Sequence, residues 1–242
     1  MNILILTGAG ISAESGIPTF RDADGLWEGH DIEEVATPQG FARNPKLVQR
    51  FYNERRRALL DPKIKPNAAH LALAQFEHEF LANPGNHFLL VTQNIDDLHD
   101  RAGSQNVLHM HGELLKAQCL ESLQCYQWRK DLDVDTPHPE DPEDERRRGF
   151  LRPNVVWFGE MPIGLDRIAD AASEADIFIA IGTSGLVYPA AGIVASTPKQ
   201  CRRIEINLDD TPASSAFHET IRGQATIEVP KMLKSLSLSK HS

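Results

Sequence analysis

The sequence contains few cysteines and no long apolar run. Its three cysteines, Cys119, Cys125 and Cys201, leave at least one thiol outside any pair, which argues against a disulfide framework and indicates a reducing compartment. Near the start, only residues 3–6 form an apolar run, which is too short for the core of a signal peptide. No stretch approaches the roughly 20 apolar residues that cross a bilayer. We therefore expect a cytoplasmic protein without a membrane partner.

Positive charge is also scarce. The chain has 25 Lys and Arg against 34 Asp and Glu, a formal net charge of -9. An acidic surface repels nucleic acid at long range, so none is expected as a partner, although Arg55, Arg56 and Arg57 form a local basic run. With 242 residues, 41% of them hydrophobic, the chain can bury one large core with a smaller insertion. We expect a monomer.

Apolar runs alternate with helical patterns along the chain. Buried parallel strands are predicted at residues 1–6, 87–92, 175–182 and 203–208. Helices are predicted at residues 45–60, 68–81 and 165–173. This alternation is typical of an α/β fold, and it predicts a Rossmann-like doubly wound parallel sheet.

Two stretches interrupt this alternation. Residues 31–85 are mostly helical in pattern, and residues 116–152 are polar and rich in proline and charge. We expect both to form a small inserted module, with a loop at 131–148 that has too little apolar surface to pack. The Rossmann-like domain would then comprise residues 1–30, 86–115 and 153–242.

Directly after the first strand, Gly8-x-Gly10-x-x-Ala13 matches the dinucleotide fingerprint, in which small residues let the backbone approach a pyrophosphate. A glycine-rich tight turn without a ligand gives the same pattern. A dehydrogenase would continue with a strand that ends in Asp or Glu about 20 residues on. Here residues 15–22 form a loop with glycine, proline, an aromatic and a charge pair. That loop is either a lid over a cofactor or a surface connection.

Polar groups follow the second predicted strand. Amide and carboxylate side chains occur at residues 93–97, at the carboxyl end of a strand, where such sheets bind ligands. His111 follows fifteen residues later beside Gly112, and a histidine that titrates near neutral pH is suited to act as a general base. His109 and His111 could also be a metal pair or one strand face, and for His109 we favour a structural role.

These motifs together resemble the sirtuin family, most closely its bacterial class III members. The chain carries, in the family's order, Gly8-Ala9-Gly10-Ile11-Ser12, Gly16-Ile17-Pro18-Thr19-Phe20-Arg21, Thr92-Gln93-Asn94-Ile95-Asp96, His111-Gly112, Phe158-Gly159-Glu160, Gly182-Thr183-Ser184 and Asn207-Leu208-Asp209. The resemblance implies a Rossmann-like domain beside a helical and zinc module, with NAD between them. It also implies NAD-dependent removal of acyl groups from protein lysines, giving free lysine, nicotinamide and O-acyl-ADP-ribose.

The resemblance also assigns residues. His111 matches the catalytic base, Asn94 and Asp96 match positions that hold the ribose and the nicotinamide amide, and Phe20 matches an aromatic near the reacting centre. The full set implied for the cofactor is Gly8, Ala9, Gly10, Ser12, Ala13, Thr19, Phe20, Arg21, Trp27, Gln93, Asn94, Ile95, Asp96, Gly182, Thr183, Ser184, Asn207, Leu208, Asp209 and Ala225. The peptide backbone would bind as a strand between Phe158, Gly159 and Glu160 on one side and residues 185–187 on the other.

A possible acyl pocket follows from helix spacing. Tyr52 and Arg55 lie three residues apart and so on one helix face, where a hydroxyl and a guanidinium could meet one carboxylate. Alanine at position 36 with Tyr-x-x-Arg resembles the desuccinylase signature, which implies preference for succinyl-lysine, with some deacetylation retained. Alternatively, Tyr52 packs in the helix core and Arg55 belongs to the basic run.

The zinc pattern of the family is incomplete here. Four thiolates complete a tetrahedral zinc site, but this chain offers only Cys119 and Cys125, a degenerate remnant, with His138 as one further donor. We therefore expect no tightly bound zinc. Two other functions remain as alternatives to the deacylase: an NAD glycohydrolase, which needs the same cofactor residues, and a non-enzymatic NAD sensor. A dehydrogenase is disfavoured by the missing acidic second strand.

Overall fold

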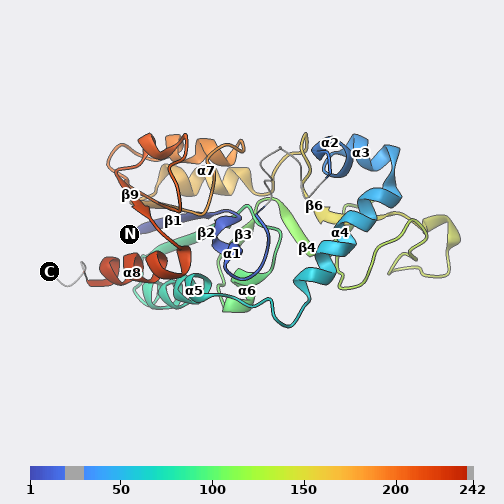
Figure 1. The fold of residues 1–242 in the computed structure, drawn as a ribbon, viewed down its shortest axis with the longest axis horizontal. Coiled ribbons are helices and arrows are strands. Elements are labelled where there is room, and N and C mark those ends of the chain that lie inside the picture. The colour runs from blue at the N-terminus through green and yellow to red at the C-terminus, as the bar shows by residue number, and fades with distance from the viewer. Residues whose placement is uncertain (20–29, 239–242) are drawn as a thin grey trace.

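A parallel sheet of six strands forms the centre of the protein (Figure 1). The structure is a computed structural model that describes residues 1–19 and 30–238. The strands follow the order β3-β2-β1-β7-β8-β9. Their bounds are β1 Asn2–Thr7, β2 His87–Thr92, β3 Val107–His109, β7 Ile177–Ile181, β8 Arg202–Asn207 and β9 Glu219–Arg222. All pairings are parallel, which confirms the predicted α/β fold.

Helices cover both faces of the sheet because its strands are apolar on both sides. In β1, Ile3 and Ile5 pack with α5 (Ala68–Leu81) and α8 (Ala225–Leu238). Leu4 and Leu6 point to the other face and pack with α7 (Leu165–Ser173) and the 3-10 helix η2 (Ala190–Ser196). Figure 1 shows α7 on one side of the sheet and α8 on the other. Successive side chains of a strand point to opposite faces, so one apolar run serves two cores.

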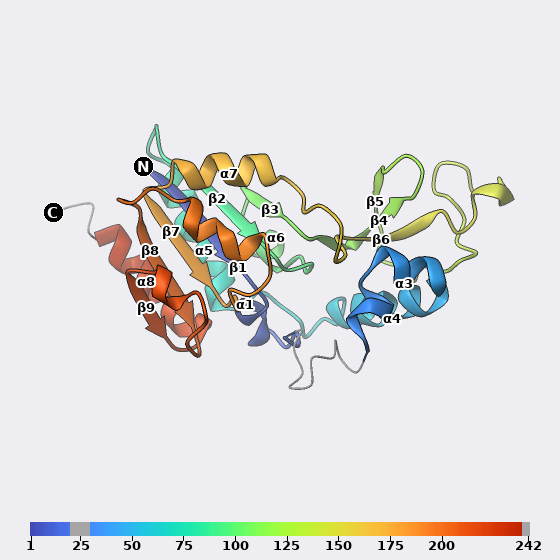
Figure 2. The ribbon, with the colours of Figure 1, turned by 90° about the horizontal axis from the view of Figure 1, so that it is seen from above.

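A small module lies to one side of the sheet and its covering helices (Figure 2). It comprises three helices and an antiparallel sheet in the order β5-β4-β6. The bounds are α2 Ile32–Val35, α3 Pro38–Arg43, α4 Pro45–Leu59, β4 Gly112–Cys119, β5 Cys125–Gln127 and β6 Leu151–Val155. Helix α4 begins where the Asn44 side chain accepts the Leu47 N–H at 3.1 Å, with Pro45 in the first turn. Its buried face shares a core with β4 and β6.

Short helical elements complete the described structure. They are α1 Gly10–Ala13, α6 Leu98–Ala102, and the 3-10 helices η1 Glu145–Arg147 and η3 Ser214–Ala216. Among the described residues, no helix has the length and apolar character needed to cross a membrane.

Two segments pack differently from what the sequence predicts. Helix α5 packs on the parallel sheet through Leu73 and Phe76, whereas residues 31–85 were predicted to form one module. The 131–148 segment does pack, since Leu132 and His138 are buried in it. Polar contacts achieve this: Asn53 of α4 donates to the Leu132 carbonyl at 2.7 Å and accepts its N–H at 2.8 Å. The prediction counted only apolar surface and so missed these bonds.

Candidate active site

The order of the strands reverses between β1 and β7, and the loops after these two strands pack backbone against backbone. The Gly8 N–H donates to the Ile181 carbonyl at 3.0 Å, and the Gly10 N–H donates to the Gly182 carbonyl at 2.9 Å. A Cβ at Gly182, where φ is +60°, would lie 2.5 Å from the Ile11 nitrogen. These glycines are therefore required for loop packing. The amides of Gly8 and Gly10 are used within the protein, a role that the fingerprint argument did not foresee.

A buried hydrogen-bond network stands behind this junction. Ser12 Oγ donates to Asp96 Oδ2 at 3.0 Å and accepts a hydrogen bond from Asn94 Nδ2 at 3.1 Å. The Leu98 N–H donates to the other Asp96 oxygen at 3.0 Å. Burial raises the pKa of Asp96, while these hydrogen bonds act in the opposite direction. The structure thus joins three of the predicted cofactor residues in one network.

Sequence reasoning missed two histidines of this region, His70 and His99. His70 Nε2 lies 3.4 Å from Ser12 Oγ, and His99 Nε2 lies 3.0 Å from Thr7 Oγ1. Both rings are buried, with centroids 4.8 Å apart. Burial lowers the pKa of His70 to about 4 and that of His99 well below its usual value. The available signal was Asn67, which caps α5 in a capping box whose third helical residue is His70.

His111 occupies the turn between β3 and β4. Its Nδ1 lies 3.0 Å from the Gln93 carbonyl oxygen. A carbonyl only accepts, so the proton of the neutral ring is assigned to Nδ1, and Nε2 keeps a lone pair. Burial lowers the pKa of His111, although the bond to Gln93 raises it. His109, in contrast, lies 3.0 Å from Asp100 Oδ2. Of the two histidines, His111 has the form that a general base requires.

Side chains also join the ends of β2, β7 and β8. Gln93 Nε2 donates to Thr183 Oγ1 at 2.9 Å, and Asn207 Nδ2 donates to the Thr183 carbonyl at 2.9 Å. The other predicted residues of this side are Ser184 after β7, exposed Leu208 and Asp209 after β8, and Ala225 at the start of α8. Ala9 and Ala13 lie at α1, and Thr19 is exposed. Phe20, Arg21 and Trp27 lie outside the described residues.

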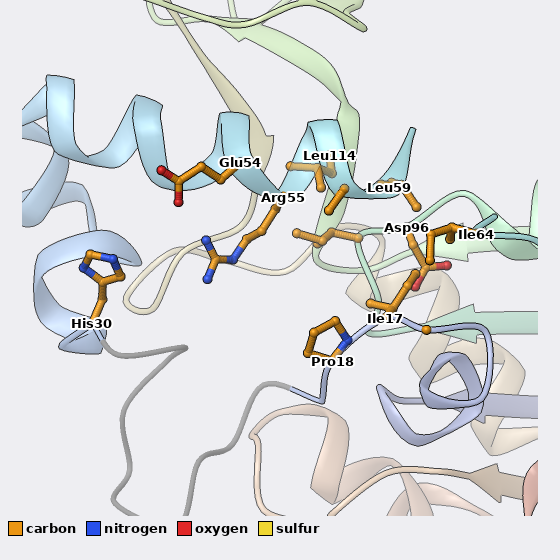
Figure 3. Close-up of a pocket in the computed structure, with 12 residues that line it drawn as sticks. Ile17, Pro18, His30, Glu54, Arg55, Leu59, Ile64, Asp96 and Leu114 are labelled. Carbon is orange, nitrogen blue, oxygen red and sulfur yellow. The ribbon is translucent and has the colours of Figure 1, made fainter. Parts of the chain in front are cut away.

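A cavity of about 320 Å³ lies where the small module meets the loops of the sheet (Figure 3). Residues that line it include Ile17, His30, Arg55, Leu59, Ile95 and Asp96. Arg55 extends from α4 into this region, and its NH1 group donates to the Phe51 carbonyl at 2.8 Å. The cavity is therefore lined both by the Arg55 guanidinium of the small module and by Asp96 of the buried network.

Tyr52 is not among the described residues that line this cavity. Its side chain is 0% exposed, and its hydroxyl accepts the Trp157 indole N–H at 3.0 Å. Burial raises the pKa of Tyr52, with the bond from Trp157 acting against this. The cavity lining includes Arg55 but neither Tyr52 nor Ala36, which is buried and whose carbonyl accepts the Phe158 N–H at 2.9 Å. The helix thus buries Tyr52 in its core while Arg55 reaches the cavity wall.

The Phe158–Gly159–Glu160 turn divides into exposed and anchored parts. Phe158 and Gly159 are exposed. Glu160 accepts two hydrogen bonds from Arg152, at 2.5 and 2.8 Å, and the Trp157 N–H at 2.8 Å. These bonds, with burial opposing them, lower the pKa of Glu160. Glu160 thus fixes the turn, and the first two residues form its surface.

The donor set for zinc does not fit a metal site. Gln118 pairs with Cys125 across β4 and β5, so the Cys119 side chain points to the opposite face of this ribbon from Cys125. Cys119 is buried and Cys125 is exposed. His138 Nε2 lies 3.1 Å from Arg147 NH2. Within residues 1–19 and 30–238, no group of three His, Cys, Asp or Glu side chains could hold a metal ion. The two thiols therefore point to opposite faces of the ribbon in this structure.

Comparison with known proteins identifies the family. The Sir2 family profile matches residues 8–189. A protein of Rhodopirellula baltica named NAD-dependent protein deacylase is 73% identical over 98% of this chain and 99% of its own. A crystal structure of a Sir2 homologue in complex with NAD is 38% identical, with a TM-score of 0.84 over 98% of this chain and 90% of its own. Sir2Tm bound to a propionylated peptide is 28% identical, with a TM-score of 0.77, over 98% of this chain and 94% of its own. The chain belongs to the Sir2 family.

Proposed function

We propose that this protein is an NAD-dependent protein-lysine deacylase that prefers acidic acyl groups such as succinyl and retains some deacetylation. The observation that carries the activity is the hydrogen bond from His111 Nδ1 to the Gln93 carbonyl, which leaves Nε2 as the acceptor of the neutral ring. The names of the relatives and the complexes of the related structures support the same activity. Bound NAD supplies the ribose that accepts the acyl group and the nicotinamide that leaves.

The residues of this chain would divide the work as follows. His111 Nε2 accepts the proton of a ribose hydroxyl. Asn94 and Asp96, whose directions the Ser12 hydroxyl fixes, hold the ribose and the nicotinamide amide. The glycine junction of Gly10 and Gly182 admits the cofactor at the switch point of the sheet, where such folds bind ligands.

The acyl preference rests on Arg55 at the cavity wall. A guanidinium that meets the acyl carboxylate in a partly buried site contributes roughly 1.5 to 3 kcal/mol, about a tenfold to hundredfold preference over acetyl. The Tyr52 hydroxyl accepts the Trp157 indole N–H and keeps its own proton as a further donor behind the cavity wall. We further propose that the peptide backbone pairs with the exposed Phe158–Gly159 segment and residues 185–187, and that the protein acts as a cytoplasmic monomer without tightly bound zinc.

The test is turnover of matched succinyl-lysine and acetyl-lysine peptides with NAD, following both nicotinamide and the deacylated peptide. We expect succinyl turnover to be preferred, to fall selectively in Arg55→Met, and to be lost for both peptides in His111→Ala. Nicotinamide release without deacylated peptide would identify an NAD glycohydrolase instead. Binding of NAD without either product would identify a sensor.

A further inference from the structure

Phe51 makes two contacts with the Arg55 guanidinium. Phe51 and Arg55 are one turn apart on α4, and Arg55 NH1 donates to the Phe51 carbonyl at 2.8 Å. In addition, Arg55 Cζ lies 3.2 Å from the centroid of the Phe51 ring, a cation–π contact. The carbonyl fixes one end of the guanidinium and the ring supports its face. Together they hold a long side chain in one direction.

The Phe51 ring is itself held in place. It is buried, and its ring meets Tyr52 at 5.1 Å and 82° and His30 at 5.4 Å and 90°. Two edge-on aromatic rings therefore contact it, Tyr52 from the helix core and His30 from the cavity wall. Phe51 is a fixed platform rather than a mobile contact.

We propose that Phe51 is a positioning residue for acyl selection, which holds the Arg55 guanidinium at the cavity wall before an acidic acyl chain arrives. This inference rests on the proposed function, in which Arg55 binds the acyl carboxylate. Because ordering a flexible side chain lowers affinity, an arginine already fixed by Phe51 binds a carboxylate more tightly than a mobile one does. The ring acts only through Arg55 and touches no reacting atom.

The experiment is a double-mutant cycle with Phe51→Leu, Arg55→Met and the combined variant, each measured on succinyl-lysine and acetyl-lysine peptides. We expect Phe51→Leu to lower succinyl kcat/KM about five- to tenfold, through KM, and to change acetyl kcat/KM by less than about twofold. In the Arg55→Met background, Phe51→Leu should have no further effect on the ratio. Phe51→Tyr, which keeps the ring, should retain the succinyl preference.

Two controls separate positioning from a general loss of packing. Val48→Ala also creates space in the buried face of α4, away from the cavity lining, and should lower stability without changing the acyl ratio. Phe51→Met fills a volume similar to that of phenylalanine without an aromatic face, and it replaces Phe51→Leu if the leucine variant does not fold.

The outcomes are distinct for the two proposals. If Arg55→Met leaves the succinyl-to-acetyl ratio unchanged, the acidic-pocket function itself is wrong. If Arg55→Met collapses the ratio but Phe51→Leu and Phe51→Met lower both substrates equally, only the inference about Phe51 is overturned. A full Phe51→Leu effect in the Arg55→Met background would also overturn it.

Discussion

His111 and Gln93 are joined through the histidine Nδ1 and the glutamine backbone carbonyl, at 3.0 Å. The two residues come from different strand ends, and the carbonyl cannot change its role as an acceptor. The ring is therefore held in the one neutral tautomer that leaves Nε2 available to a substrate hydroxyl. A main-chain acceptor also means that substitution of the Gln93 side chain should leave this bond intact.

The first prediction concerns the pH dependence of deacylation. The base must be neutral, and burial lowers the pKa of His111 below its ordinary value of about 6.5. The kcat/KM for succinyl peptide should thus stay high down to a pH below 6.5 and fall as His111 becomes protonated. His111→Ala should lower turnover by about 10² to 10⁴-fold. An acid limb at or above pH 6.5 in the wild type would contradict the buried, neutral base.

The second prediction concerns the glycine junction. In Gly182→Ala the new Cβ would collide with the Ile11 backbone at a positive φ, so we expect unfolding free energy to drop by about 2 to 4 kcal/mol and NAD binding to be lost. Gly192→Ala is the matched control, because its Cβ would meet only the Tyr188 ring at 3.6 Å. Urea unfolding and NAD titration measure both. Equal urea midpoints for the two variants would refute the packing argument.

The third prediction concerns acid stability. The pKa of His70 falls from 6.5 to about 4 on folding because the ring is buried, so the unfolded state takes up a proton first as pH drops. Stability from this group is complete above pH 6.5 and is lost progressively towards pH 4, on the order of 3 kcal/mol. His70→Gln should flatten the decline of unfolding free energy over that range. His87→Gln, at an exposed position, should leave the slope as in the wild type.

The fourth prediction concerns the contribution of Arg147 to the stability of the small module. Arg147 NH2 lies 3.1 Å from His138 Nε2 and 3.6 Å from a Glu140 carboxylate oxygen, and the Arg147 side chain is 26% exposed. The Arg146 side chain is 90% exposed and hydrogen-bonds Asp144. Arg147→Ala should lower unfolding free energy by about 1 to 3 kcal/mol, and Arg146→Ala by less than about 0.5 kcal/mol.

Metal removal tests the same module independently. Cys119 and Cys125 lie on opposite faces of the β4–β5 ribbon, so a chelator should leave the Tm unchanged. Metal analysis of the purified protein is the direct measurement. Stoichiometric zinc together with a lower Tm after chelation would show that other side chains complete a zinc site and would contradict this prediction.

Local composition and spacing were enough to predict the parallel sheet and the position of the site at the strand ends. Buried parallel strands are continuous apolar runs, so residues 87–92 could be assigned to a strand from local composition, and helix α5 from its period. Short strands such as β3 and the strands of the small sheet were missed, because their few residues carry no period of their own. The motif residues at strand ends fell at one edge because parallel strands all end there.

Which of these residues contact one another could be read only from the folded structure. The register of β4 against β5 separates Cys119 from Cys125, and helix packing buries Tyr52 while Arg55 reaches the cavity. His70 entered the network of Ser12 through a contact between residues 58 positions apart. A local pattern fixes which face a side chain takes on its own element. The residues that this side chain contacts depend on strand register and on packing between distant segments. Neither can be read from spacing along the chain.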